Sequence, residues 1–258
     1  MKMDRLHIYK IGGNILDNES RLHSFLKDFS SLNESKILIH GGGKEATSVS
    51  NKLGIPVKLN NGRRITDAAT LDIITMVYAG KINKRIVSKL QALSCDSIGI
   101  CGADGNAYMS SKRTVEELDF GFVGDITHIN KSFFKKLLKN NIIPVCCAVS
   151  HDGNGQLLNT NADTIASEIA SALSENFKVD LTYCFEKKGV LENIGDLNSV
   201  IPTINTEKYE ELKNKGLIQE GMLPKLHNCY QALSKGVKEI RIGSFNILSD
   251  NKYTKIVL

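Results

Sequence analysis

Five short segments of the sequence carry residue types that bind anions. Two of them are glycine-rich, Lys10-Ile-Gly-Gly and His40-Gly-Gly-Gly, and each follows an apolar run. Glycine lets backbone N–H groups approach a phosphate closely, and a helix that begins there adds a favourable partial charge. Lys10 stands in an otherwise apolar run, where an ammonium group costs desolvation free energy unless it meets an anion. Both segments suit phosphate binding, although strand-end glycines alone are more often tight turns.

The other three segments add cations and amides. Asn60–Thr66 contains two adjacent arginines, and an arginine at a turn can bind a carboxylate through two hydrogen bonds or remain solvated. Asn161 and Asp163 open a helix, where both suit capping. Lys225 falls in the first turn of another helix, and the helix dipole disfavours a cation there, which favours a bound anion.

The common nucleotide-binding motifs are absent. A P-loop would need Ser or Thr after Gly43-Lys44, and the sequence has Glu45. The dinucleotide pattern G-x-G-x-x-G also fails after Gly41. The glycine segments therefore indicate a phosphate site only if the other polar groups lie close to them in the fold.

Strands that alternate with helices must position these residues. This order predicts an α/β fold: a doubly wound, mostly parallel central sheet with helices on both faces, and a small antiparallel β ribbon within residues 107–129. Such sheets bind ligands at the carboxyl ends of their strands, here the loops after residues 11, 40, 101, 149 and 185. The expected strands are Leu6–Ile11, Lys36–His40, Ser97–Cys101, Ile142–Val149, Val179–Phe185, Val237–Ile242 and Thr254–Leu258. The expected helices are Arg21–Phe29, Lys44–Leu53, Asp67–Leu93 with an interruption at Gly80, Lys131–Lys139, Ala162–Leu173, Thr206–Lys213 and Pro224–Leu233.

Length and composition narrow the class of protein. The 258 residues fit one α/β domain or two lobes that share a core. The net charge is +5, but aromatic residues make up only 6% and Trp is absent, which argues against nucleic-acid binding and favours an anionic small molecule. The longest apolar run, Ile142–Val149, is too short for a membrane span, so we expect a cytoplasmic protein without a membrane partner. The six cysteines form no C-x-x-C pair, which argues against zinc and a disulfide framework.

In their order and spacing, these segments resemble the N-acetylglutamate kinases of the amino acid kinase family. The resemblance extends from about residue 6 to the end of the chain. The more specific matches are Asn61-Gly-Arg-Arg-Ile-Thr66 and Leu158-Asn-Thr-Asn-Ala-Asp163. The others are Lys10-Ile-Gly-Gly, His40-Gly-Gly-Gly and Gly221-Met-Leu-Pro-Lys225, together with the helix that contains Asp72-Ile-Ile-Thr75 and Asn83-Lys84.

The resemblance implies a kinase of arginine biosynthesis. It would transfer a phosphoryl group from ATP to the γ-carboxylate of N-acetyl-L-glutamate and form an acyl phosphate. Mg²⁺ would be carried by the ATP phosphates, with no metal ligands from the chain. The single amino acid kinase domain, residues 1–258, would bind the acylglutamate in a lobe of about residues 1–175 and ATP in a lobe of about residues 176–258.

The resemblance also implies the site residues, carried over by motif. The catalytic residues would be Lys10, Lys225 and Asp163, with the lysines stabilising the transferring phosphoryl group and Asp163 orienting them. Phosphate would be bound by Gly12, Gly13, Gly42 and Gly43. The acylglutamate would be bound by Gly42, Gly43, Arg64 and Asn159. ATP would be bound by Glu186, Lys187, Lys188, Gly189, Val190, Leu191, Leu217, Ile218 and Gln219.

The sequence departs from the family pattern in three places. Relatives have Leu-[ST]-Asp-Val-x-Gly-[IV]-Leu where this chain has Cys184-Phe-Glu-Lys-Lys-Gly-Val-Leu191, so Glu186 replaces an Asp. Tyr253-Thr254 replaces the usual Gly-Thr. The extra amino-terminal helix of arginine-inhibited, hexameric members is absent before the first strand, so we expect a homodimer that is insensitive to arginine.

Three alternatives remain open at this point. The acyl group can be succinyl, because Arg63 and Lys58 stand close to Arg64 in the sequence and would suit a negatively charged acyl group. The acceptor can be an N-acylated or carrier-linked aminoadipate, which differs by one methylene. The chain can also be a non-catalytic ligand-binding protein of the same fold.

Overall fold

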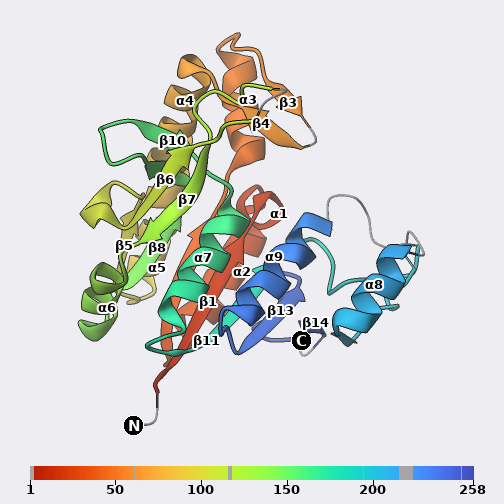
Figure 1. The fold of residues 1–258 in the computed structure, drawn as a ribbon. Coiled ribbons are helices and arrows are strands. Elements are labelled where there is room, and N and C mark those ends of the chain that lie inside the picture. The colour runs from red at the N-terminus through yellow and green to blue at the C-terminus, as the bar shows by residue number, and fades with distance from the viewer. Residues whose placement is uncertain (1–2, 61, 116–117, 194, 215–222, 251) are drawn as a thin grey trace. The chain divides into compact units, whose positions relative to one another are not determined.

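The computed structural model describes residues 3–60, 62–115, 118–193, 195–214, 223–250 and 252–258. Contacts between residues group the chain into two compact units (Figure 1). Unit 1 consists of Met1–Lys36 and Ala166–Leu258, and unit 2 of Ile37–Ile165. Within the described ranges, every helix is too short or too polar to cross a membrane.

The sheet strands of unit 1 are largely parallel. In order across the sheet they are β12 (Thr203–Ile204), β14 (Thr254–Ile256), β13 (Glu239–Gly243), β11 (Lys178–Cys184) and β1 (Arg5–Ile11). β1 and β13 each pair with β11 in parallel, whereas β14 runs antiparallel to β13. Six of the seven residues of β11 are buried, as expected for a strand that is covered on both faces.

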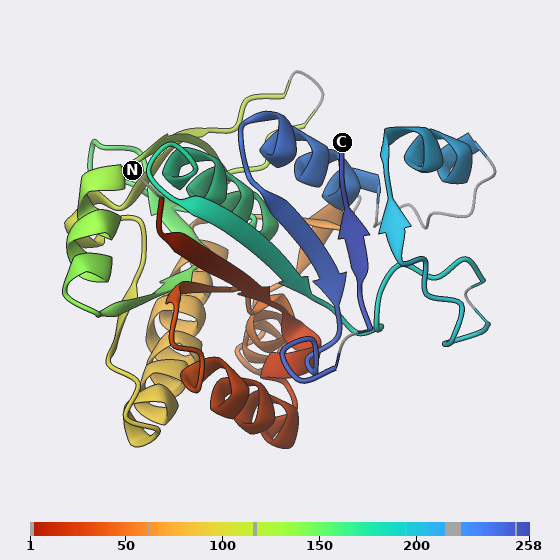
Figure 2. The same ribbon diagram turned by 90° about the horizontal axis from the view of Figure 1, so that it is seen from below.

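Helices cover both faces of this sheet (Figure 2). α2 (Glu19–Ser30) lies on one face, where its apolar side packs Phe25 and Phe29 edge-on against Tyr9 of β1. α7 (Ala162–Leu173) and α9 (Leu223–Ser234) lie on the other face. The short α1 (Gly13–Leu16) follows β1, and α8 (Thr206–Asn214) follows β12.

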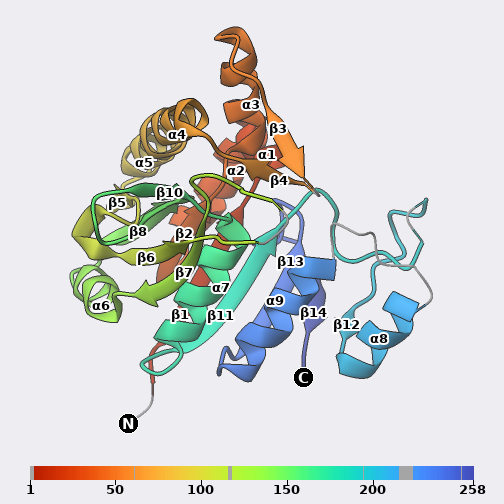
Figure 3. The same cartoon turned by 45° about the horizontal axis from the view of Figure 1, so that its top comes forward.

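Unit 2 contains parallel strands and a separate small sheet. β2 (Ser35–His40) and β5 (Ser97–Ile100) each pair in parallel with β8 (Ile143–Cys147). The small sheet has the order β10 (Leu157–Asn159), β9 (Val149–His151), β6 (Tyr108–Lys112) and β7 (Gly124–Ile129). β3 (Lys58–Asn60) and β4 (Arg63–Ile65) form an antiparallel hairpin that lies beside α3 (Gly43–Lys52), as Figure 3 shows.

One long helical stretch in unit 2 changes its winding in the middle. α4 (Ala68–Ile74) leads into a π-helical segment, Thr75–Ile82, and then into α5 (Asn83–Ala92). The interruption expected at Gly80 is therefore a change to wider winding within continuous helix. π-Helical turns are rare and often lie at functional sites. The remaining helices of the described part of unit 2 are α6 (Lys131–Lys139) and a 3₁₀ turn at Asp104–Asn106.

The predicted fold class is confirmed: the chain has an α/β fold with a mostly parallel sheet and a small antiparallel ribbon. β6 and β7 form the ribbon expected within residues 107–129, with a bulge between Met109 and Ser110. The sequence reading missed β9 and β10, because three-residue strands show too little alternation to detect. The two compact units have different bounds from the expected lobes, so the division of substrates near residue 175 stays a prediction.

Candidate active site

Lys10 is a buried cation close to the carboxyl end of β1. It lies on the same face of the strand as Leu6 and Ile8, and only 8% of its surface is exposed. The chain then turns through Gly12, where a Cβ atom would lie 3.4 Å from Lys10 Nζ. A buried ammonium group placed at this turn is suited to stabilise the negative charge of an anion that binds there.

Lys10 and Lys225 meet at one aromatic ring in unit 1. Phe185 directly follows β11, and Lys225 Nζ lies 4.0 Å from the centroid of its ring. Lys10 Nζ lies 5.6 Å from the same centroid. The two lysines predicted to be catalytic are far apart in the sequence, and the fold brings both to the end of β11.

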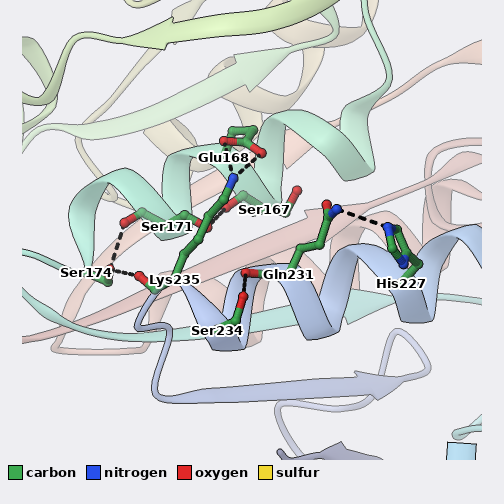
Figure 4. A network of polar contacts seen from close by, with 8 residues as sticks. All are labelled: Ser167, Glu168, Ser171, Ser174, His227, Gln231, Ser234 and Lys235. Carbon is green, nitrogen blue, oxygen red and sulfur yellow. Dashed lines mark hydrogen bonds and ion pairs between the residues drawn. The ribbon is translucent and has the colours of Figure 1, made fainter. Parts of the chain in front are cut away.

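Contacts between α7 and α9 hold the helix that carries Lys225 (Figure 4). Lys235 near the end of α9 forms an ion pair with Glu168 of α7, with Nζ and Oε1 3.1 Å apart. Ser174 Oγ donates a hydrogen bond to the Lys235 carbonyl at 2.9 Å. α7 also carries two small buried side chains, Ala166 and Ala170. These contacts hold the carboxyl-terminal end of α9 against α7 within unit 1.

The second glycine segment forms the start of α3 in unit 2. β2 ends at His40, and Gly42 is the residue that caps the helix. A Cβ atom on Gly42 would lie 2.5 Å from Ile82 Cδ1 and 2.8 Å from Tyr78 Cδ1, so only glycine fits against the π-helical segment. The first backbone N–H groups of a helix have no partner within the helix, which makes this terminus suited to an anion.

Arg64 lies against the first turns of α3. Its Nη2 donates hydrogen bonds to the Gly43 carbonyl at 3.0 Å and to Thr47 Oγ1 at 2.7 Å. Its Nη1 is buried and has no hydrogen-bond partner within the described ranges. Burial of a polar nitrogen without a hydrogen-bond partner costs on the order of several kcal/mol of lost hydration. This position therefore favours binding of a carboxylate, which can accept hydrogen bonds from the guanidinium group.

Asn159 lies next to the segment that contains Arg64. Its Nδ2 donates a hydrogen bond to Thr66 Oγ1 at 3.0 Å, and Thr66 is fully buried. Burial raises the pKa of Tyr78, whose phenol therefore stays protonated beside Arg64 and Gly42. Unit 2 thus brings the predicted substrate residues Gly42, Gly43, Arg64 and Asn159 into one neighbourhood.

The β3–β4 hairpin separates Arg64 from its basic neighbours. In the register, Arg64 pairs with Leu59, whereas Arg63 pairs with Asn60 and Lys58 with Ile65. Because side chains alternate along a strand, Arg63 and Lys58 extend from the opposite face to Arg64. The hairpin gives no support to the cation beside Arg64 that a charged acyl group would need.

Asp163 lies in the first turn of α7, and only 7% of its surface is exposed. Asn161 caps this helix, since its Oδ1 accepts hydrogen bonds from the backbone N–H groups of Asp163 at 2.7 Å and Thr164 at 3.2 Å. Asn161 therefore has the structural role considered from the sequence. The role of Asp163 in orienting the lysines stays a prediction.

The predicted ATP segment begins after β11 and is anchored by Thr254. The buried Thr254 hydroxyl accepts a hydrogen bond from the Val190 N–H at 2.8 Å and donates one to the Ile201 carbonyl at 2.7 Å. A Cβ atom on Gly189 would lie 2.6 Å from Thr254 Oγ1, so the close approach requires glycine. Thr254, whose role the sequence left open, shapes this segment.

The remaining residues of the predicted ATP site differ in their surroundings. Glu186 is exposed, and Leu191 is buried and bridges to Val200. Lys188 forms an ion pair with Asp250, with 3.3 Å between Nζ and Oδ2. Leu217, Ile218 and Gln219 lie outside the described residues, as do Gly221 and Met222 of the motif that precedes Lys225.

His40 is a buried residue at the glycine segment that sequence reasoning left without a role. Its Nδ1 donates to the Gly41 carbonyl at 2.8 Å, and its Nε2 accepts from Asn83 Nδ2 at 3.1 Å. Asn83 also donates to the Val145 carbonyl at 2.9 Å. Burial lowers the pKa of His40 to about 4, so the imidazole is neutral and ties the end of β2 to α5.

Metal ligands are not gathered in the described part of the chain: no group of three or more His, Cys, Asp or Glu side chains could hold a metal ion there. The cysteines described as buried, such as Cys184, act as small apolar side chains, and burial raises the pKa of Cys184 to about 12.

Comparison with known proteins identifies the family. The model of the amino acid kinase family matches residues 5–244. The acetylglutamate kinase of Cytophaga hutchinsonii is 52% identical over 99% of both chains, and that of Phocaeicola vulgatus is 48% identical over 98% of both. The acetylglutamate kinase of Nostoc sp. is 36% identical and covers 92% of this chain and 80% of its own length.

Solved structures show the same fold. A protein of Streptococcus mutans UA159 superposes with a TM-score of 0.82 at 26% identity and covers 98% of each chain. Carbamate kinase from Giardia lamblia superposes with a TM-score of 0.69 at 14% identity, over 99% of this chain and 98% of that one. The sequence match and the shared fold lead to one conclusion: the chain belongs to the amino acid kinase family.

Proposed function

We propose that this chain transfers the γ-phosphoryl group of ATP to the γ-carboxylate of N-acetyl-L-glutamate, a step of arginine biosynthesis. The observation that carries the proposal is the identity of 46–52%, over nearly the full length, with proteins named acetylglutamate kinase. A carboxylate oxygen attacks the γ-phosphorus of ATP, the bond to the bridging oxygen of ADP breaks, and an acyl phosphate forms.

Unit 2 binds the acylglutamate. The free Nη1 of Arg64, together with its fixed Nη2, pairs with the α-carboxylate of the substrate. Asn159 and the backbone N–H groups of Gly42 and Gly43 bind neighbouring polar groups. The γ-carboxylate is ionised at pH 7, so the reaction needs no general base.

Unit 1 supplies the charge for phosphoryl transfer. Lys10 and Lys225 share the ring of Phe185 and stabilise negative charge on the phosphoryl oxygens in the transition state. Gly12 and Gly13 offer backbone donors at the same end of β1, and Asp163 orients the lysines. Catalysis is then alignment and electrostatic stabilisation, without a covalent intermediate.

ATP binds against the segment Glu186–Leu191, which Thr254 holds in place. Mg²⁺ neutralises charge on the phosphates when it is bound. The ATP phosphates would hold the ion, since Mg²⁺ keeps several of its waters and commonly binds through substrate phosphates.

A homodimer is also part of the proposal. β5 is the last strand of its sheet, and Ile98 on it is 42% exposed, so this edge is a candidate contact with a second copy. Static light scattering tests the assembly: a mass near that of two chains supports the dimer, and a monomer or hexamer contradicts it. A cytoplasmic location stays a prediction.

A hydroxamate assay with Mg-ATP tests the proposed reaction, because hydroxylamine traps acyl phosphates. N-Acetylglutamate, N-succinylglutamate and N-acetylaminoadipate are compared at equal concentration. We expect the highest kcat/KM with N-acetylglutamate. A higher value with N-succinylglutamate would keep the mechanism and overturn the acyl group, and no product with any acceptor would overturn the kinase assignment.

A further inference from the structure

We propose that Phe185 is a positioning residue for phosphoryl transfer, and that its ring holds the ammonium groups of Lys10 and Lys225 at the transfer site. This inference rests on the proposed function. It adds a residue to which the motif match assigns no role.

The ring of Phe185 is anchored on the sheet. Its backbone N–H donates to the Gly243 carbonyl of β13 at 2.7 Å. The ring stacks almost parallel to that of Tyr183, with centroids 6.0 Å apart and planes inclined by 5°. Tyr183 is 1% exposed and pairs in register with Lys10 of the adjacent strand β1. Phe185 is therefore held from two sides beside the strand that carries Lys10.

Both lysines lie within the range of a cation–π interaction with this one ring. Lys225 Nζ is 4.0 Å from the centroid and Lys10 Nζ is 5.6 Å from it, against a limit of about 6 Å. Lys10 comes from a strand and Lys225 from a helix, so no local element sets their separation. The ring of Phe185 is one contact that both lysines share.

An aromatic ring can assist the orientation proposed for Asp163 without adding negative charge. Two ammonium groups repel each other, and the negative face of a ring attracts each of them. A carboxylate would also attract them, but it would cancel part of the positive charge that the phosphoryl oxygens need in the transition state. The ring of Phe185 holds the lysines and leaves their full charge available.

Three variants test the kinetic consequence. Phe185→Leu keeps an apolar side chain but removes the ring, and Phe185→Tyr restores the ring. Tyr209→Leu is the matched control, because Tyr209 also lies under a lysine, Lys213 at 5.9 Å, on α8. We expect Phe185→Leu to lower kcat about tenfold, which is about 1.4 kcal/mol in the barrier, with each KM changed less than about threefold.

We expect Phe185→Tyr to keep at least about half of the wild-type kcat and Tyr209→Leu to leave kcat unchanged. Equal kcat for Phe185→Leu and wild type, or an equal loss in Phe185→Leu and Phe185→Tyr, would overturn the inference. Melting temperatures of all variants separate a loss of folded protein from a loss of turnover.

Nuclear magnetic resonance of lysine tests the geometry independently of activity. In protein labelled with ¹³C-lysine, the ring current of Phe185 should shift the εCH₂ protons of Lys10 and Lys225 upfield. Arginine variants of each lysine assign the two signals. We expect both shifts to vanish in Phe185→Leu and to persist in Phe185→Tyr, and unshifted signals in the wild type would overturn the inference.

The two measurements also separate this inference from the proposed function. If the wild type forms no acyl phosphate but shows both shifted signals, the proposed function fails and the lysine arrangement stands. If the wild type is active and Phe185→Leu retains its kcat, only the inference fails.

Discussion

Replacement of Arg64 by alanine should weaken binding of the acylglutamate and leave ATP binding intact. Among the described residues, Arg64 Nη1 is buried and has no hydrogen-bond partner, and Nη2 is held by the Gly43 carbonyl and Thr47 Oγ1. Loss of a charge-assisted pair of hydrogen bonds to a carboxylate costs about 1.5–3 kcal/mol. This predicts a KM for N-acetylglutamate raised about 10- to 100-fold.

The different effects on kcat and on the two KM values identify the role of Arg64 in this variant. Arg64 binds the substrate equally in the ground state and the transition state, so kcat should fall less than about threefold and the KM for ATP should stay within twofold. Loss of its two hydrogen bonds at the start of α3 should also lower the free energy of unfolding by about 1–2 kcal/mol, measured by urea titration.

Arg63→Ala is the matched control, because Arg63 is the adjacent residue of β4 and extends from the opposite face of the hairpin. It should leave every kinetic constant within about twofold of wild type. Initial rates in a coupled ADP assay, with each substrate varied in turn, measure kcat and both KM values. An unchanged KM in Arg64→Ala, or an equal rise in Arg63→Ala, would refute the assignment of the carboxylate to Arg64.

Three further predictions concern the lysine, the ATP segment and the buried histidine. Lys10→Ala should lower kcat at least about a hundredfold, about 2.7 kcal/mol in the barrier, in the coupled ADP assay, and near-normal turnover would exclude the assigned role. Thr254→Val leaves the Val190 N–H and the Ile201 carbonyl without their partner, so it should lower the free energy of unfolding in urea by about 2 kcal/mol and raise the KM for ATP. Thr254→Ser keeps the hydroxyl and should retain wild-type stability and KM. A Thr254→Val variant as stable as wild type would contradict this prediction. The pKa of His40 is about 4 in the folded protein and about 6.5 in the unfolded chain. The unfolded state therefore binds a proton first as the pH falls, so the free energy of unfolding is highest above pH 6.5 and decreases by about 3 kcal/mol in total as the pH falls towards 4. Urea titrations between pH 4 and 7.5 measure this loss, and an identical pH dependence in His40→Gln would show that another group causes it.

The sequence was sufficient for the fold class because its longer elements have clear periodicity. The glycines after Ile11 and His40 marked two strand ends, and the apolar positions from Asp67 to Leu93 marked the long helix. The sequence did not reveal that Thr75–Ile82 winds as a π-helix, nor that Tyr78 and Ile82 of this segment lie against Gly42. Local pattern does not encode such tertiary contacts.

For the candidate site as well, the sequence predicted some features and the structure was needed for others. Motif spacing indicated Lys10, Arg64, Asn159 and Lys225, but not what holds them. The sequence assigned no role to Phe185 or Thr254, and their contacts with the lysines and with Val190 became apparent in three dimensions. The motif match singled out Arg64 from the basic pair Arg63-Arg64, and the register of the hairpin places the two side chains on opposite faces.

The most direct test of the central claim is a ³¹P nuclear magnetic resonance time course of the wild-type protein with Mg-ATP and N-acetyl-L-glutamate. Transfer to the carboxylate predicts one new acyl phosphate signal for each ADP formed, and no consumption of ATP when the acceptor is omitted. ADP that appears with inorganic phosphate alone, at a rate independent of the acceptor, would contradict it.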